Sequence, residues 1–307
     1  MPAPANQQRR RRLRIGAQPQ TIVAFLLPFF VPFVLFYLIP VLYAITQSFL
    51  KVQRGSGQYG TSEIVFGGFS QYARVFGNSE FWASIGRTAL YGIVQVPIML
   101  ALSLIIALLL DSALVRGKAF FRITAFLPYA VPGVIAAIMW SFLYHPQISP
   151  IVDLLQHVGI NANFLSRSAV LFSIANISTW LFTGYNMIIM FSALQGIPQE
   201  VYEAAKVDGA SSFGIATRIK VPMIIPSIIL TAVFSIIGTL QLYTEPTVLA
   251  QIAPSISSTF TPNMMAYSIA SGNNYQEAAA MSVVIALATF ILSFGFMKLT
   301  SRKASSL

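Results

Sequence analysis

The sequence predicts an all-α integral membrane protein with six transmembrane helices, and three observations lead to this fold class. Hydrophobic residues make up 56% of the 307 residues, whereas charged residues make up only 9%. The mean hydropathy is +0.71. Long intervals without any charged residue recur along the chain. Soluble domains carry about a quarter charged residues, so the composition excludes a disordered protein and argues strongly against a cytosolic enzyme or a nucleic-acid binder.

Six charge-free intervals each hold about 20 predominantly apolar residues, which is the length that a helix needs to cross a hydrocarbon core of about 30 Å. The spans are predicted at 21–46, 88–110, 123–143, 168–192, 223–244 and 278–298. They form a transmembrane domain over residues 21–300, between a basic tail at 1–20 and a short tail at 301–307. The first apolar region is too long for the hydrophobic part of a cleaved signal peptide, so it is predicted to remain as a span.

A further charge-free interval, residues 246–276, is rich in Ser, Thr, Asn, Gln and Pro. Insertion of this interval would leave many polar groups in hydrocarbon. It is therefore predicted to be a loop on the outer side. Residues 51–83 and 144–167, which are the other two long outer connections, are also predicted to be loops.

The basic residues predict the orientation of the chain. If both termini lie in the cytoplasm, fourteen lysines and arginines face inward and five face outward, in agreement with the positive-inside rule. The tract Arg9–Arg12 is explained by this rule and by anionic lipid. It does not indicate a nucleic acid as a partner, because the basic residues form no interleaved basic surface.

The inner connection at 193–222 is predicted to contain two short helices that meet at a glycine. Pro198 suits a first helical turn, and Gly209 suits a left-handed residue that closes a helix. Ser211 or Ser212 can cap the second short helix, and Pro222 marks the entry into the fifth span. A simple connector would not need this arrangement.

The same connection resembles the EAA loop in permease subunits of bacterial ATP-binding-cassette importers. The resemblance rests on Glu203, Ala204, Ala205, Gly209, Ile219 and Pro222. Asp208 lies in the same loop and is included with them as a predicted coupling residue. The longer stretches IPQEVYEAAKVDGAS, TGYNMIIMFSALQG and IKVPMIIP are similar to the carbohydrate branch of that family. The similarity extends over most of the chain, from the first span to the sixth.

The resemblance implies a permease subunit in the bacterial cytoplasmic membrane that carries a sugar or an oligosaccharide. In that family the loop is a coupling helix that docks on a cytoplasmic ATPase subunit, and an extracellular or periplasmic binding protein delivers the cargo. The chain has no G-x-x-x-x-G-K-[ST] phosphate loop, so ATP and Mg²⁺ are expected on the ATPase and no cofactor on this chain. One coupling loop, set against the two grooves of an ATPase dimer, implies a second permease chain and two ATPase copies. The extra first span resembles the larger, maltose-permease type of subunit.

Three alternatives to a sugar importer remain open at this stage. The loop at 193–222 could be an amphipathic connector on the lipid surface, and the cargo could be a solute other than a sugar. An ion-coupled secondary transporter would also fit six spans, but such proteins usually need ionisable groups near the bilayer midplane. Here Glu245 and Glu277 are expected only at the outer ends of spans.

No pattern in the sequence predicts an enzyme or a metal site. The chain has no cysteine, and its two histidines, His145 and His157, lie in an outer connection without an H-E-x-x-H motif. No pair of carboxylates lies within a span, and no nucleophile elbow is recognisable. We therefore expect no catalytic residue and no metal ligand in this chain.

Polar and aromatic residues within the spans are candidates for the lining of a sugar path. Amides can pair with sugar hydroxyls, and aromatic rings can stack on pyranose faces. The candidates are Asn176, Trp180, Tyr185 and Asn186 in the fourth span, with Gln241 and Tyr243 at the end of the fifth. The same residue types also occur in interfacial belts and in hydrogen bonds between helices. The segment Thr244–Glu245–Pro246 departs from the Gly-Gly-Pro turn of many sugar permeases, which leaves the particular sugar open.

Overall fold

The computed structural model describes residues 19–54, 62–112 and 115–304, so the basic tract Arg9–Arg12 and most of the two predicted tails lie outside the described residues. The chain divides into two compact units, residues 1–46 and 47–307. In the first unit, α1 (Pro19–Phe33) continues through a π-helical segment (Val34–Leu38) into α2 (Ile39–Ser48). Pro28 and Pro32 lie inside α1. Because proline removes a backbone donor, the wider π-helical turn follows this proline pair.

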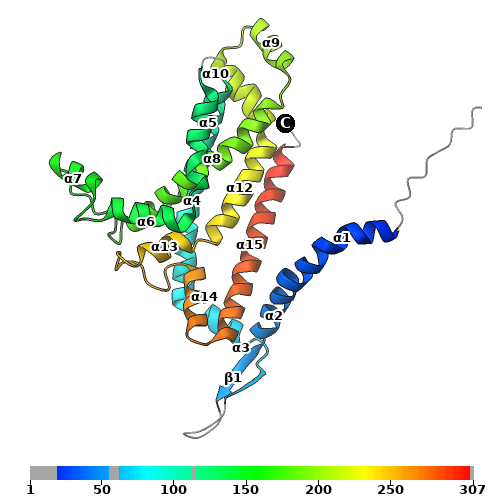
Figure 1. Cartoon of the computed structure of the whole chain (residues 1–307), viewed down its shortest axis with the longest axis vertical. Helices are drawn as coiled ribbons and strands as arrows, with labels where there is room; N and C mark the ends of the chain where they lie inside the picture. The colour runs from blue at the N-terminus through cyan, green and yellow to red at the C-terminus, as the bar shows by residue number, and fades with distance from the viewer. Residues whose placement is uncertain (1–18, 55–61, 113–114, 305–307) are drawn as a thin grey trace, which may run out of the picture. The chain divides into compact units, whose positions relative to one another are not determined.

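The second unit is built around four long helices. They are α4 (Ser79–Asp111), α8 (Val170–Gln195), α12 (Ile225–Leu240) and α15 (Tyr275–Ala304). Figure 1 shows them side by side, with α4 packed on α8 and α12, and α12 packed on α15. Within the described ranges, five helices are long and apolar enough to cross a membrane, and six if one bent pair counts as a span. The predicted helical membrane fold is confirmed.

The third predicted span, 123–143, is not one straight helix. It consists of α5 (Lys118–Phe126), a 3₁₀ turn (Leu127–Ala130) and α6 (Gly133–Tyr144), and the axis bends by 95°. The cause is local, because Pro128 and Pro132 lack amide donors and the residue before a proline avoids the helical region. Val131 accordingly has extended backbone angles of φ −79° and ψ 127°.

The helix that contains the second predicted span, 88–110, starts nine residues before that span. Helix α4 starts at Ser79, where the Asn78 side chain accepts hydrogen bonds from the amides of Glu80 and Phe81. Arg87 lies inside the helix, and its guanidinium donates to the carbonyls of Phe260 (3.0 Å) and Thr259 (2.7 Å). The charge-free interval is therefore shorter than the helix, because Arg87 can lie within the helix and donate hydrogen bonds to backbone carbonyls of a distant segment.

The connections predicted for the outer side contain more regular structure than predicted. Residues 246–276, predicted as a loop, contain most of α13 (Thr244–Leu249) and all of α14 (Pro262–Ser271). The polar side chains of this stretch satisfy backbone groups: the Thr261 hydroxyl donates to the Leu242 carbonyl at 3.0 Å, and the Asn263 amide donates to the Leu240 carbonyl at 2.9 Å. Internal pairing explains how so polar a segment can pack against the bundle.

The other two outer connections also hold regular elements. An antiparallel hairpin of β1 (Leu50–Arg54) and β2 (Ser62–Phe66) pairs Lys51 with Val65 and Val52 with Ile64. It is followed by α3 (Ser70–Gly77), and the connection after α6 contains α7 (Pro150–His157). This hairpin forms a two-stranded sheet in the described part of the chain, which is otherwise helical.

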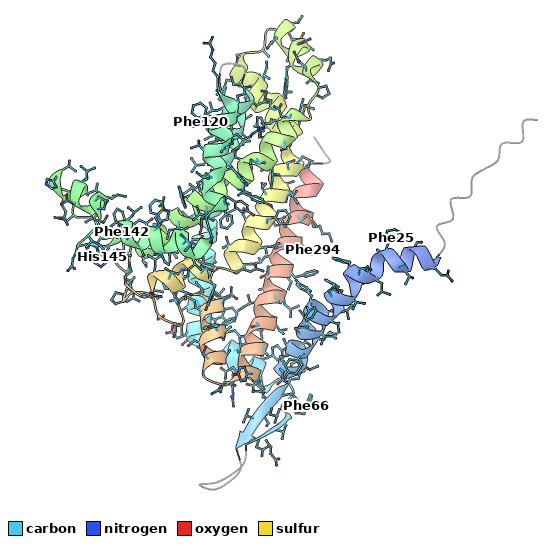
Figure 2. The ribbon with its side chains drawn as sticks, viewed as in Figure 1. Phe25, Phe66, Phe120, Phe142, His145 and Phe294 are labelled. Carbon is cyan, nitrogen blue, oxygen red and sulfur yellow. The ribbon has the colours of Figure 1, made fainter. Side chains whose placement is uncertain are left out.

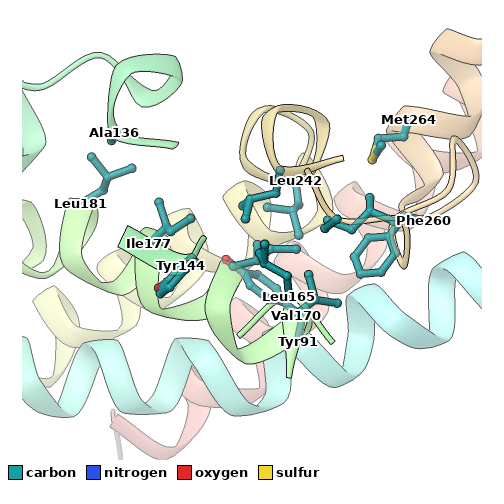
Figure 3. Close-up of a cluster of buried hydrophobic side chains, with 14 residues drawn as sticks. Tyr91, Ala136, Tyr144, Leu165, Val170, Ile177, Leu181, Leu242, Phe260 and Met264 are labelled. Carbon is teal, nitrogen blue, oxygen red and sulfur yellow. The ribbon is translucent and has the colours of Figure 1, made fainter. Parts of the chain in front are cut away.

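Buried side chains form a core on each half of the bundle. The cluster shown in Figure 3 joins α4, α6, α8 and the segment after α12, through residues such as Tyr91, Ile177, Leu242 and Phe260. Toward the other end, Leu110 of α4 packs with buried side chains of α8 and with Ile224. These two clusters hold the long helices in register.

The outer surface of the bundle is strongly apolar. Figure 2 shows Phe120, Phe142 and Phe294 as side chains on helix surfaces, and they are 69%, 51% and 52% exposed. Soluble monomers rarely expose large contiguous apolar patches. A surface of this kind suits contact with lipid hydrocarbon.

The second unit has two distinct ends (Figure 1). One end carries α9 (Gln199–Val207) and α10 (Ser212–Ile215), near the start of α5 and the C-terminal end of α15. The opposite end carries the hairpin, α3 and α14. Within the second unit, the described segments that the basic residues assign to the inner side, before α5, around α9 and α10 and at the end of α15, are therefore at one end of the bundle.

Candidate functional site

The connection at 193–222 folds as the predicted helix–glycine–helix arrangement. After α9, Gly209 adopts a left-handed backbone with φ +80°, and the Ser211 hydroxyl accepts a hydrogen bond from the Gly214 amide at 3.1 Å, which caps α10. A π-helical segment (Ala216–Lys220) and a short turn, α11 (Val221–Met223), lead into α12. We refer to residues 199–215 as the projecting loop.

Most of the predicted coupling residues lie on the accessible side of the projecting loop. Glu203, Ala204 and Asp208 are exposed, and the Glu203 carboxylate accepts a hydrogen bond from the Gln199 side chain at 2.9 Å. Ala205 is buried instead. Of the two predicted residues beyond α10, Ile219 is half-buried and Pro222 is exposed.

Two large apolar side chains of the projecting loop are almost fully accessible. Val207 at the end of α9 is 87% exposed, and Phe213 in α10 is 79% exposed. They flank Gly209 in sequence, one on each of the two short helices of the projecting loop. Side chains as exposed as these two are available for contact with another protein.

A charged cluster anchors the base of the projecting loop, and we call it the basal cluster. The Lys220 ammonium forms an ion pair with the Asp111 carboxylate at the end of α4, with side-chain exposures of only 15% and 7%. The Gln195 amide donates to the same carboxylate at 2.6 Å. The Lys220 ammonium also lies 4.8 Å from the centre of the Tyr202 ring. The cluster therefore joins α4 to the chain on both sides of the projecting loop, through Gln195 before it and Lys220 after it.

Tyr202 is the member of the basal cluster that lies on α9. Its hydroxyl donates to the Leu194 carbonyl at 3.4 Å. Burial, and then the Asp111 carboxylate, raise the pKa of the Tyr202 hydroxyl. The phenol therefore keeps its proton at neutral pH and continues to donate this hydrogen bond.

Gly209→Val is expected to misdirect α9 and to abolish transport while leaving assembly of the membrane bundle intact. A Cβ atom at Gly209 would meet no other atom within 4 Å, so the cost is conformational, on the order of 1 to 2 kcal/mol. Gly209→Asn is the matched control, because asparagine tolerates the left-handed region. Uptake by membrane vesicles measures the effect, and normal uptake by Gly209→Val combined with Glu203→Lys would show that the loop is only a connector.

A second candidate site is a cavity of about 430 Å³ within the bundle. Its volume lies in the range of about 300–1,000 Å³ that is usual for small-molecule sites. The lining combines aromatic rings, amides, hydroxyls and one carboxylate. It consists of Tyr91, Gln95, Met99, Tyr129, Ser178, Phe182, Tyr185, Asn186, Phe234, Ser235, Gly238, Thr239, Gln241, Leu242, Tyr243, Thr244 and Glu245.

Four of the six predicted path residues line this cavity: Tyr185, Asn186, Gln241 and Tyr243. The Tyr185 ring stacks on Tyr129, with centroids 4.7 Å apart and an interplanar angle of 22°. The Asn186 amide donates to the Phe182 carbonyl at 3.1 Å. Its side chain is therefore held in place within the wall.

The other two predicted path residues do not line the cavity. Asn176 donates a hydrogen bond to the Tyr144 hydroxyl at 2.8 Å, and Trp180 packs edge-on against Trp140, with centroids 6.0 Å apart. Both side chains join α8 to α6. Asn176 and Trp180 therefore fit the alternative role given to these residue types, in which polar and aromatic side chains hold neighbouring helices together.

Sequence reasoning missed several wall residues. Tyr91, Gln95 and Met99 recur at intervals of four along α4 and therefore lie on one face of the helix, a periodicity that could have identified them. Glu245, which the sequence places at the outer end of the fifth span, is only 8% exposed and lines the cavity, and the sequence did not predict this. The break between α12 and α13 turns it inward.

The two histidines have local roles. The His145 Nδ1 atom accepts a hydrogen bond from the Gln147 amide at 3.3 Å, and the His157 ring lies 3.7 Å from the Asp153 carboxylate one helical turn away. Within the part of the chain that the structure describes, no group of three or more His, Cys, Asp or Glu residues is placed to hold a metal ion.

Together, the helical membrane bundle, the polar cavity and the projecting loop define a membrane transport protein. The chain belongs to the family of binding-protein-dependent transport system inner membrane components, which matches residues 3–306. This match confirms the permease family predicted from the EAA-like residues. Members of this family are membrane components of ATP-binding-cassette transporters, in which a separate subunit hydrolyses ATP.

Curated relatives and a solved structure agree with this assignment. The chain is 32% identical over 266 residues to the lactose transport system permease protein of Rhizobium radiobacter, which covers 82% of this chain and 86% of the relative. It is 26% identical over 295 residues to an arabinooligosaccharides transport system permease protein of Halalkalibacterium halodurans, with 92% and 88% covered. The fold matches a chain of a bacterial transporter involved in the import of the acidic polysaccharide alginate, with a TM-score of 0.79, 20% identity, and 92% and 96% covered.

Proposed function

We propose that this chain is the permease subunit of an ATP-driven importer that passes a sugar or an oligosaccharide across the cytoplasmic membrane. The family membership makes the chain a component of a binding-protein-dependent system. Relatives whose names specify lactose and arabinooligosaccharides support a carbohydrate cargo. A binding protein outside the membrane is the expected source of that cargo.

The observation that carries the proposal is the projecting loop. A rigid helix–glycine–helix unit, anchored to α4 by the basal cluster, can pass a movement of a docked subunit into the bundle, whereas a mobile connector would absorb it. Val207 and Phe213 supply the exposed apolar groups for docking, and Glu203 and Asp208 supply acidic groups that would suit a basic groove. The docked subunit is the ATPase, which holds ATP and Mg²⁺.

The cavity is the proposed passage for the cargo. The amide side chains of Asn186 and Gln241 can pair with sugar hydroxyls, and the rings of Tyr129 and Tyr243 offer apolar faces for a pyranose. Such a wall combines aromatic contact area with a few polar groups, which is the usual composition of a small-molecule site. The particular sugar depends first on the binding protein.

The expected complex contains this chain, one other permease subunit and two copies of the ATPase. One projecting loop per permease chain and two grooves per ATPase dimer lead to this stoichiometry. Purification of the tagged chain from native membranes, followed by native mass spectrometry, tests it. We expect a 1:1:2 complex and no ATPase activity of the chain alone. A stable homodimer that transports, or robust hydrolysis by the lone chain, would contradict the proposal.

The proposed orientation places the projecting loop and both termini in the cytoplasm, as the positive-inside rule requires. Ser212 lies in the projecting loop and Ser257 lies toward the opposite end, and both are exposed. In intact cells, Ser257→Cys is expected to react with membrane-impermeant thiol reagents, whereas Ser212→Cys is expected to react only with permeant ones. Labelling of Ser212→Cys from outside would reverse the orientation.

A further inference from the structure

The wall of the cavity contains a single acidic side chain, that of Glu245. Among the residues that line the cavity there is no other aspartate or glutamate and no lysine, arginine or histidine. Glu245 is only 8% exposed, and no ion pair within the described ranges involves its carboxylate. The cavity therefore carries one buried acidic group without a basic partner.

Glu245 lies in the first turn of α13, a short helix whose N-terminus compensates only part of a negative charge. Its carboxylate accepts a hydrogen bond from its own backbone amide, but no hydrogen bond in the described part of the chain joins it to another side chain, and the nearby residues Leu242 and Leu249 are buried and apolar. Burial of a carboxylate without a basic partner is costly. Ionisable residues within a membrane protein usually face a water-filled cavity and mark the route of a solute. The carboxylate is thus placed to act on whatever enters the cavity.

We propose that Glu245 is a specificity-determining residue that selects the cargo by charge. This inference rests on the proposed function and narrows its substrate class. The carboxylate can accept hydrogen bonds from two adjacent hydroxyl groups of a neutral sugar, and it attracts the ammonium group of an amino sugar. It repels the carboxylates of uronate oligosaccharides across a short distance in a medium of low dielectric constant. The path therefore admits neutral or cationic sugars and turns away acidic ones.

The charge of the cavity can be measured without knowledge of the cargo. The natural chain has no cysteine, so Ser235→Cys adds one thiol to the wall of the cavity. The purified complex is treated at pH 7.5 with a cationic trimethylammonium-ethyl or an anionic sulfonato-ethyl methanethiosulfonate, and labelling of this chain is followed by mass spectrometry. The ratio of the two rates, each divided by the rate with a free thiol, reports the local charge.

Glu245→Gln is expected to lower the cation-to-anion ratio about tenfold, because it removes one unit of charge near the thiol. Glu80→Gln is the matched control: this carboxylate is exposed and does not line the cavity, so its removal is expected to leave the ratio unchanged. In uptake assays, Glu245→Gln is expected to relax exclusion of the uronate form of a transported disaccharide.

Two results would overturn the inference, and they differ in what they imply. An equal ratio in Glu245→Gln and in the unsubstituted background would show that Glu245 does not charge the cavity, while sugar import would stand. Failure of both reagents and of a small neutral methanethiosulfonate to label Ser235→Cys and Ser178→Cys, with and without vanadate-trapped ATP, would exclude the cavity from the path. That outcome would refute both the inference and the proposed passage.

Discussion

Lys220→Met is expected to destabilise the complex by about 3 to 5 kcal/mol and to uncouple ATP hydrolysis from uptake. The substitution removes the cation beside the Asp111 carboxylate, whose side chain is only 7% exposed. Loss of one partner of a buried pair leaves an uncompensated charge, which costs this much in other proteins. The hydrogen bond from Gln195 to Asp111 remains, but an amide cannot neutralise the charge.

The double variant separates the charge effect from a packing effect. Asp111→Asn with Lys220→Met removes both charges, so we expect it to recover most of the thermal stability that Lys220→Met loses. The measurement is the apparent melting temperature of the complex in detergent, together with the ratio of sugar imported to ATP hydrolysed. Wild-type stability and coupling in Lys220→Met alone would show that the basal cluster does not anchor the projecting loop.

Gly184→Ala is expected to be the most damaging substitution in the bundle of those that add a single methyl group. A Cβ atom at Gly184 in α8 would lie 1.9 Å from the Ala125 carbonyl oxygen and 2.8 Å from the Phe126 Cα atom. Both are backbone atoms of α5, which cannot rotate away as a flexible side chain can. We expect a loss of about 3 kcal/mol, at the upper end of overpacking effects.

The expected functional consequence of Gly184→Ala follows from the position of the clash. The adjacent residue, Tyr185, stacks on Tyr129, which follows α5, so displacement of α5 would open this wall of the cavity. Gly295→Ala is the matched control, because a Cβ atom at this helical glycine meets nothing within 4 Å. Yield and melting temperature of the purified complex measure the difference, and equal values for the two variants would contradict the close approach of α5 and α8.

The fold class follows from the sequence because every span must present about 20 mostly apolar, uncharged residues to the lipid. Long charge-free intervals locate the helices well where no internal charge or proline interferes, as in α8. The rule fails at Arg87, whose guanidinium donates hydrogen bonds to the carbonyls of Phe260 and Thr259, and at Pro128 and Pro132, which break the third span. The proline break has a local cause that is visible in the sequence itself, whereas the acceptors of Arg87 are known only from the tertiary structure.

The two parts of the candidate site differ in how far the sequence predicts them. The projecting loop is a local structure, so its proline, glycine and serine signals predict the helices, the left-handed Gly209 and the Ser211 cap. The cavity and the basal cluster join segments that are distant in sequence: Lys220 and Asp111 are separated by 109 positions. Glu245 becomes a wall residue only because the chain breaks after α12. Such contacts require the tertiary structure.

The most direct test of the importer assignment is sugar uptake by the purified complex in proteoliposomes. The sugar is the one that the copurifying binding protein retains, identified by mass spectrometry and supplied in radiolabelled form. We expect accumulation only when the binding protein is present on the outer face and ATP is hydrolysed on the cytoplasmic face. Uptake by the chain alone, driven by a proton or sodium gradient in the absence of ATP, would contradict the account.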